Sequence, residues 1–78
     1  MQEDRRMKLY VVQTGHDYEG ETLQGVFTSL QKALFEIKLN YSTNIMSKWW
    51  GDSCTVAELT LNDTNTPLVV WESWTDKL

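Results

Sequence analysis

Cysteine, proline and basic residues are scarce in this chain of 78 residues. The single cysteine, Cys54, excludes an internal disulfide and a cysteine-based zinc site. It fits a reducing compartment, so we expect a cytoplasmic protein. Seven Lys and Arg residues against eleven Asp and Glu residues give a net charge of −4. This balance argues against direct binding to nucleic acid or to an anionic membrane surface.

Long apolar runs and low-complexity segments are also missing. No run approaches the roughly 18 apolar residues that a membrane-spanning helix needs, and the opening MQEDRRM is too charged for a signal peptide. We expect a flexible arm over residues 1–6, one small domain over residues 7–75 and a frayed end over residues 76–78. Because so short a chain buries only a modest core, self-association would add stability.

Alternation of apolar and polar residues predicts four strands separated by turn-forming clusters. The first and last strands are apolar on both sides, which favours the centre of a sheet. In the third strand, Ala57, Leu59 and Leu61 are expected to face the core, and in the second, Leu23 and Phe27 share one side. The predicted fold class is α+β, a ββαββ chain with a four-stranded, largely antiparallel sheet and one long helix packed on one face. The predicted strands cover residues 8–14, 22–28, 55–62 and 68–74.

The segment between the second and third strands predicts the helix. Thr28 and Gln31 have the spacing of a capping box, and Gly51 has the freedom that a residue ending a helix requires. A stripe at helical spacing predicts the core face: Leu30, Leu34, Ile37, Tyr41 and Ile45.

A second apolar stripe lies nearly opposite the first if the helix is continuous, and it comprises Phe35, Leu39, Met46 and Trp50. One sheet covers only one of the two stripes, so the second would meet another chain. The weak helix formers from Asn40 to Asn44 leave an alternative, in which the helix breaks and Met46 and Trp50 join the core.

No combination of residues has the spacing of a catalytic, metal or phosphate-binding motif. His16 and the neighbouring carboxylates do not match a metal-binding loop, and His16 with Cys54 lacks a nucleophile signature. We therefore predict no enzyme, no metal and no cofactor. The acidic hairpin is expected to steer approach to a basic partner, and it comprises Asp17, Tyr18, Glu19 and Glu21.

Four tryptophans exceed the ordinary need of one small core, and tryptophan is enriched at protein interfaces. Trp71 and one tryptophan of the Trp49–Trp50 pair could instead cap the core. The candidate interaction residues are Phe35, Leu39, Met46, Trp49, Trp50, Trp71 and Trp74.

The run YVVQTGHDYEGETLQGVFTSLQKAL resembles a group of small, uncharacterised single-domain proteins of bacterial and phage genomes. The resemblance implies an accessory factor and supplies no site residues. The leading hypothesis is a non-enzymatic protein that binds and occludes a partner protein. It would also form a homodimer, through the second stripe or through the second face of the sheet. The alternative is a protein that binds or sequesters a nucleotide or metabolite by stacking it on tryptophan.

Overall fold

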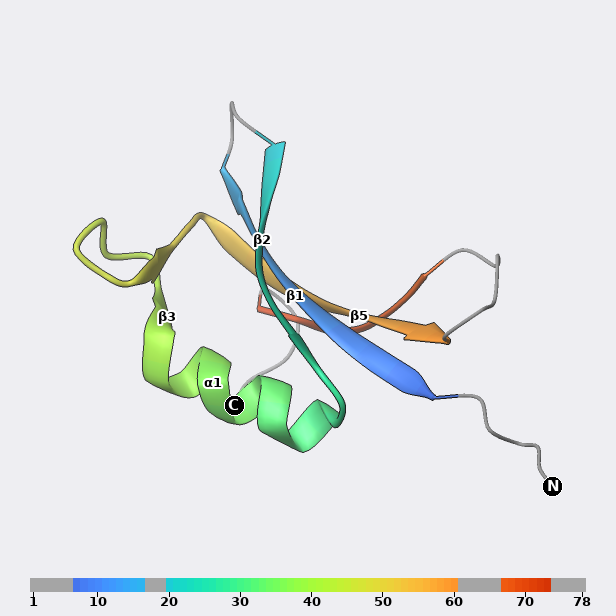
Figure 1. Ribbon diagram of the computed structural model, residues 1–78. Coiled ribbons are helices and arrows are strands. Elements are labelled where there is room, and N and C mark those ends of the chain that lie inside the picture. Colours follow the sequence, from blue (N-terminus) through green and yellow to red (C-terminus); the bar gives the residue numbers. More distant parts are fainter. Residues whose placement is uncertain (1–6, 17–19, 61–66, 74–78) are drawn as a thin grey trace, which may run out of the picture.

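The computed structural model describes residues 7–16, 20–60 and 67–73. It confirms an α+β fold, in which a four-stranded antiparallel sheet of order β2-β1-β5-β6 carries one helix on one face (Figure 1). Two short strands pair in parallel beside this sheet, so the chain has more strands than the predicted ββαββ pattern. The elements are β1 Lys8–His16, β2 Gly20–Phe27, α1 Leu30–Asn40, β3 Tyr41–Ser42, β4 Trp49–Trp50, β5 Ser53–Thr60 and β6 Leu68–Glu72.

The centre of the sheet is formed by β1 and β5. The prediction for β1 is confirmed, but the last strand, β6, lies at the edge and pairs only with β5 among the described strands. Apolar residues on both sides of β6 therefore do not mark a central strand. Trp71 faces the helix and is buried, whereas Val69 lies opposite Ala57 on the other face and is half exposed.

The face of β5 that meets the helix is the opposite of the predicted one. Val56 lies opposite Val12 in the antiparallel register, and both are fully buried. Ala57 and Leu59 point to the other face, where they lie opposite Val11 and Leu9. Both sides of β5 carry apolar residues, so the alternation within β5 does not determine which side faces the helix. The pairing with β1 determines it. Leu61 lies outside the described residues.

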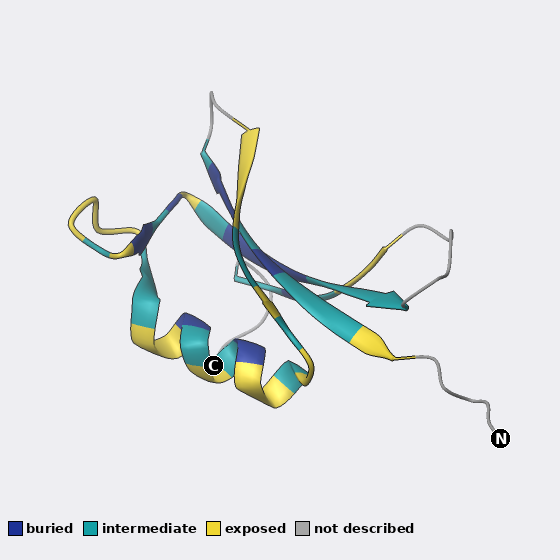
Figure 2. Ribbon diagram, in the orientation of Figure 1, coloured by how far each residue is buried: buried dark blue, intermediate teal, exposed yellow. Residues whose placement is uncertain are grey.

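A β-bulge in β2 makes a second prediction wrong, namely that Leu23 and Phe27 share one side of the strand. The register shifts between Val12 and Gln13, so Phe27 pairs with Tyr10 while Leu23 pairs with Gln13. Tyr10 and Gln13 are an odd number of residues apart in β1, so their side chains point to opposite faces of the sheet. Their partners Phe27 and Leu23 therefore also lie on opposite faces. Leu23 is among the exposed residues of β2 (Figure 2).

The helix begins one residue later than predicted and ends well before the predicted end, so it is not one long helix. Ser29, not Thr28, is the N-cap, and its hydroxyl accepts a hydrogen bond from the Lys32 amide at 3.0 Å. The helix ends at Asn40, whose side-chain amide donates to the Glu36 carbonyl oxygen at 2.9 Å. Tyr41 then takes an extended conformation. The predicted alternative of a break is confirmed, and Gly51 does not end the helix. The second part of that alternative is wrong, because Met46 is 85% exposed and neither Met46 nor Trp50 belongs to the buried core.

The core lies between α1 and the sheet. Ala33 and Ile37 are fully buried, while Leu30, Leu34 and Tyr41 pack around them at partial burial. Figure 2 shows the buried residues of α1 on the side toward the strands. Ile45 departs from the predicted core stripe because the chain has left the helix five residues earlier, and it is exposed.

Candidate functional site

Two of the predicted interaction tryptophans are core residues. Trp49 and Trp71 are each only 7% exposed and pack with Val12, Cys54 and Val56. The prediction that they anchor a partner is therefore wrong, and the alternative that they cap the core is confirmed for both. Trp74, like the acidic hairpin residues Asp17, Tyr18 and Glu19, lies outside the described residues.

Trp50 connects the loop after the helix to the end of β1. Its indole Nε1 donates a hydrogen bond to the Thr43 carbonyl oxygen at 2.8 Å. Its ring centroid lies 4.4 Å from that of His16, with the two planes at 37°. One ring therefore holds the loop closed and also contacts the sheet, which accounts for Trp50 without a partner.

The remaining predicted residues are exposed and belong to two consecutive segments. Phe35 and Leu39 lie on the outer side of α1, and we call them the helix patch. Met46 lies on the loop between β3 and β4, together with Ile45, which we call the loop tip. These four side chains are 58% to 85% exposed. The sequence prediction missed Ile45, because a continuous helix placed it on the core side.

The loop tip has a defined backbone. The Asn44 side-chain oxygen accepts a hydrogen bond from the Met46 amide at 2.9 Å, and the Asn44 amide donates to the Ser42 hydroxyl at 3.0 Å. The Ser47 amide donates to the Asn44 carbonyl oxygen at 2.8 Å. Such local bonds by asparagine and serine are typical of turns. Ile45 and Met46 are thus held at the outside of an ordered turn.

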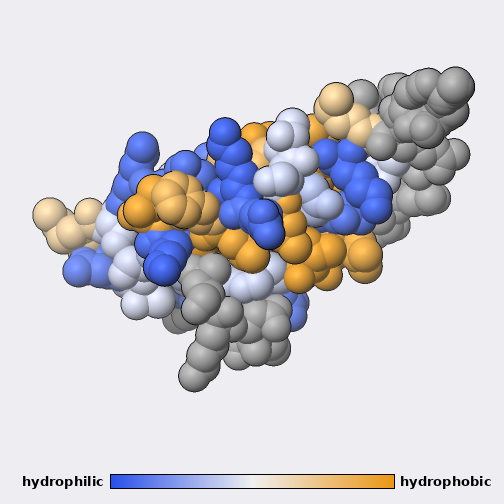
Figure 3. Space-filling view, turned by 90° about the horizontal axis from the view of Figure 1, so that it is seen from below, coloured by the Kyte–Doolittle hydropathy of each residue, from blue (hydrophilic) through white to orange (hydrophobic). Residues whose placement is uncertain are grey.

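Lysines surround the helix patch although the whole chain is acidic. Lys32 and Lys38 lie three residues before and after Phe35, so both flank it on the helix surface, and both are exposed. Lys48 is exposed on the following loop. Seen from below, the surface nearest α1 alternates between apolar and hydrophilic groups (Figure 3). Lysines therefore flank the helix patch at Phe35, while Glu36 lies three residues before Leu39.

A second apolar surface lies on the side of the sheet away from α1. We call it the open face. Leu23, Val26 and Val69 are 49% to 58% exposed, and the more central residues are partly buried by one another. The apolar residues of the open face are Leu9, Val11, Leu23, Val26, Ala57, Leu59 and Val69. The signal is present in the sequence, since residues 8–14 are apolar on both sides, which predicts a central strand. The second face of the sheet is also one of the two surfaces predicted for a homodimer.

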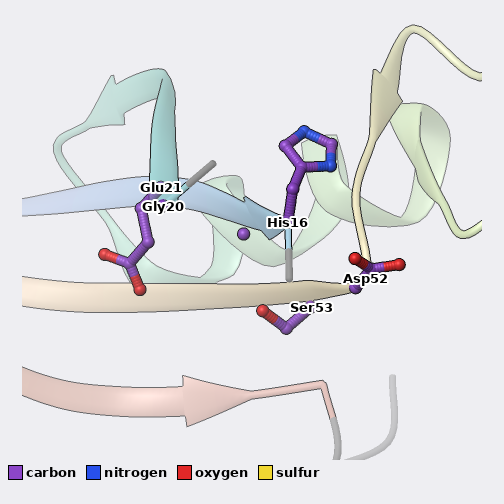
Figure 4. Close-up of a pocket in the computed structure, with 6 residues that line it drawn as sticks. His16, Gly20, Glu21, Asp52 and Ser53 are labelled. Atoms are coloured by element: carbon purple, nitrogen blue, oxygen red, sulfur yellow. The ribbon is translucent and has the colours of Figure 1, made fainter. Parts of the chain in front are cut away.

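A cavity of about 260 Å³ lies where the β1–β2 hairpin leaves the sheet, lined by residues including His16, Glu21, Asp52 and Ser53. Figure 4 shows the His16 imidazole and the Glu21 carboxylate pointing away from each other. Within residues 7–16, 20–60 and 67–73, no three His, Cys, Asp or Glu side chains are grouped as metal ligands. The His16 and Glu21 side chains of this cavity are therefore not directed at one point.

Cys54 is not placed as a nucleophile. It is fully buried in β5 opposite Thr14, and burial raises the pKa of its thiol to about 12. The thiol is therefore protonated at neutral pH, whereas thiol chemistry requires the thiolate. Cys54 acts as a small apolar residue of the core.

Comparison with protein-family models, curated proteins and solved structures gave no match. The resemblance to small bacterial and phage proteins therefore stays a prediction. The helix in the described part of the chain has 11 residues and is too short to cross a membrane. Function has to be inferred from the surfaces themselves.

Proposed function

We propose that this chain is a non-enzymatic protein-binding module whose docking site is the helix patch together with the loop tip. The observation that carries the proposal is the exposure of four large apolar side chains on two consecutive segments: Phe35, Leu39, Ile45 and Met46. Phe35 and Leu39 are four residues apart on α1 and are therefore neighbours on its surface, and contiguous exposed apolar side chains are typical of protein interfaces. The ordered turn at Asn44 reduces the entropy that the loop tip loses on binding.

The charges beside the site define the partner. Lys32 and Lys38 flank Phe35, so a complementary surface places carboxylates around an apolar pocket that receives the phenyl ring. This differs from the sequence hypothesis of an acidic hairpin approaching a basic partner, because the exposed apolar anchors lie among lysines. Binding covers the partner's surface, and occlusion is the proposed mode of action of a bacterial or phage accessory factor.

A binder of small molecules through tryptophan stacking has less support. Trp49 and Trp71 are buried in the core, and His16 lies against the ring of Trp50. The cavity beside the hairpin is lined by glycine, serine and charged residues and has no described tryptophan in its lining. Pockets for small molecules are mostly lined by apolar and aromatic side chains.

The test begins with capture of partners from the native host on the immobilised chain, followed by purification of each candidate. Calorimetry then gives Kd for the wild type and for the variants Phe35→Ala and Leu39→Ala. We expect each variant to weaken binding at least about tenfold, because truncation of an apolar anchor typically costs more than 1 kcal/mol. Lys32→Glu is expected to slow association and to reduce its dependence on salt.

Leu68→Ala is the matched control, because Leu68 is 61% exposed but lies on β6, away from the helix patch. It is expected to leave Kd within about twofold. Equal affinity of Phe35→Ala, Leu39→Ala and Leu68→Ala for every purified partner would rule the site out.

A further inference from the structure

The open face lacks a covering layer in the described structure. The helix packs on one side of the sheet, and no described element lies on the other (Figure 1). Only seven apolar residues of the described chain are buried. A sheet with apolar residues on both faces is stable when both are covered, and small domains commonly gain the missing core by association.

We propose that a second copy of this chain covers the open face, so that two sheets pack face to face in a symmetric homodimer. The surface is self-complementary in chemistry. Val11 and Ala57 form its central pair, and Leu9 and Leu59 form the next. The pair between them in the register, Tyr10 with Glu58, points to the other face of the sheet. Interfaces of homodimers are richer in apolar area and poorer in charge than the rest of a protein surface.

The size of the face agrees with what a stable dimer needs. The outer strands β2 and β6 lie three strand spacings apart, and the central strands β1 and β5 have nine and eight residues. With strands about 4.8 Å apart and a rise of about 3.3 Å per residue, strands of nine, eight, eight and five residues project to about 480 Å². Two copies then bury about 950 Å², which is close to the lower limit of about 1,000 Å² for a specific protein interface.

The charges select one of two ways to superpose the faces. The carboxylates at the open face, Glu21 opposite Gly15 and Glu72 opposite Thr55, lie toward the same end of the sheet. A two-fold axis parallel to the strands would stack the two acidic ends. An axis perpendicular to the strands, passing the level of Val11 and Ala57, places them at opposite ends.

In this second arrangement the Glu21 side chains of the two copies lie about 26 Å apart, because each is four residues from the axis. The two Glu72 side chains lie about 13 Å apart by the same measure. Both separations exceed the screening length of about 8 Å at physiological salt. The net charge of −4 on each chain thus does not oppose this dimer at the contact itself.

Sedimentation equilibrium on the full chain, from about 1 μM to 1 mM, tests the dimer, whose mass is twice that of the 9.1 kDa chain. Val69→Lys and Leu68→Lys are matched variants, since they alter neighbouring exposed residues of β6 by the same charge. Val69 lies on the open face, whereas Leu68 pairs with Glu58 and lies on the other. We expect Val69→Lys to raise the dimer dissociation constant at least tenfold and Leu68→Lys to leave it unchanged.

Val26→Lys on β2 is expected to act like Val69→Lys, and circular dichroism checks that each variant is folded. Leu39→Lys alters the helix patch and is expected to leave the dimer intact, so this proposal and the proposed function fail separately. A wild-type monomer throughout the concentration range would overturn the dimer. So would equal weakening by Val69→Lys and Leu68→Lys, or full dimerisation of both Val69→Lys and Val26→Lys.

Cross-linking tests the direction of the axis. With the axis perpendicular to the strands, Val26 lies near it and meets its own copy, so Val26→Cys is expected to cross-link to a dimer with a short bismaleimide. Glu21→Cys is expected to stay monomeric on the same gel, and the buried Cys54 does not react. Cross-linking of Glu21→Cys without cross-linking of Val26→Cys would overturn this arrangement.

Discussion

The imidazole of His16 lies 4.4 Å from the indole ring of Trp50, centroid to centroid, and this contact joins the end of β1 to the loop that follows the helix. Trp50 in turn donates to the Thr43 carbonyl oxygen at the start of the same loop. The loop tip is therefore positioned by residues that lie outside it. A variant that loosens this contact is expected to release the loop without exposing the core.

His16→Ala is expected to lower the free energy of unfolding by about 1 kcal/mol, the usual magnitude for a pair of stacked rings. His16→Phe keeps a ring against Trp50. It also removes the His16 Nδ1 atom, which is buried without a hydrogen-bond partner among the described residues, so it is expected to be neutral or stabilising. Urea unfolding followed by tryptophan fluorescence measures both. Equal loss in the two variants would show that the ring contact contributes nothing.

Gly51 is expected to tolerate no side chain. A Cβ atom added there would lie 2.9 Å from the Thr14 Cβ and 3.0 Å from the Gly15 carbonyl oxygen. Because these atoms belong to the central strand β1, the contact cannot relax by rotating a flexible side chain. Gly51→Ala is therefore expected to cost about 1–3 kcal/mol of stability, as overpacking usually does.

Gly20→Ala is the comparison for Gly51→Ala. Gly20 has a φ of 78° and no atom within 4 Å of an added Cβ, so only backbone strain of about 1 kcal/mol is expected. The midpoints of thermal unfolding rank the two variants. A smaller shift for Gly51→Ala than for Gly20→Ala would contradict the close packing of Gly51 against β1.

Elements with a clear residue period could be predicted from the sequence. The four main strands and the start of the helix, within one residue, follow from local alternation and helix-forming residues. The prediction of one long helix is wrong, and the weak helix formers after Asn40 indicate the break only as an alternative. Strand order and face could not be derived in this way. They depend on long-range pairing, which places Val56 rather than Ala57 beneath the helix and shifts Leu23 by a bulge.

The candidate site also combines residues that a local pattern predicts with residues whose placement depends on long-range pairing. Exposure of Phe35 and Leu39 follows from helical spacing, because Ala33 and Ile37 face the sheet. The burial of Trp49 depends instead on the parallel pair that β4 forms with β3, which no local pattern indicates. Composition alone predicted more tryptophan at the surface than the fold places there.

The two apolar stripes of the helix sequence are expected to differ sharply in their effect on stability. Ile37→Ala removes a fully buried side chain and is expected to cost about 2–5 kcal/mol. Phe35→Ala removes a larger side chain, but one that is mostly exposed, and is expected to cost less than about 0.5 kcal/mol. Chemical denaturation at equilibrium measures both. A large loss of stability in Phe35→Ala would place Phe35 in the core and remove it from the docking site.

Cys54 is expected to make the protein sensitive to alkaline pH. Its folded-state pKa of about 12 lies above the ordinary value of 9.0, so the folded state favours the neutral thiol more strongly than the unfolded chain does. The contribution of the neutral Cys54 thiol to the free energy of unfolding is therefore fully present below about pH 9 and declines as the pH rises from 9 toward 12. Burial in the apolar core is the cause, because it penalises the charged thiolate.

Unfolding free energies of the wild type and Cys54→Ala, measured from pH 7 to 11, test this origin. Cys54→Ala is expected to be less stable at pH 7 because it leaves a small cavity, yet to lose less stability as the pH rises. Tyr10 and Tyr41 also have raised pKa values, Tyr10 chiefly through its hydrogen bond to Glu58 and Tyr41 chiefly through burial. Both tyrosines are present in both proteins, so the difference between the two pH profiles reports the thiol together with its smaller effect on the pKa of Tyr41. Parallel profiles would show that Cys54 can ionise in the folded protein without cost, which contradicts its burial beneath the helix.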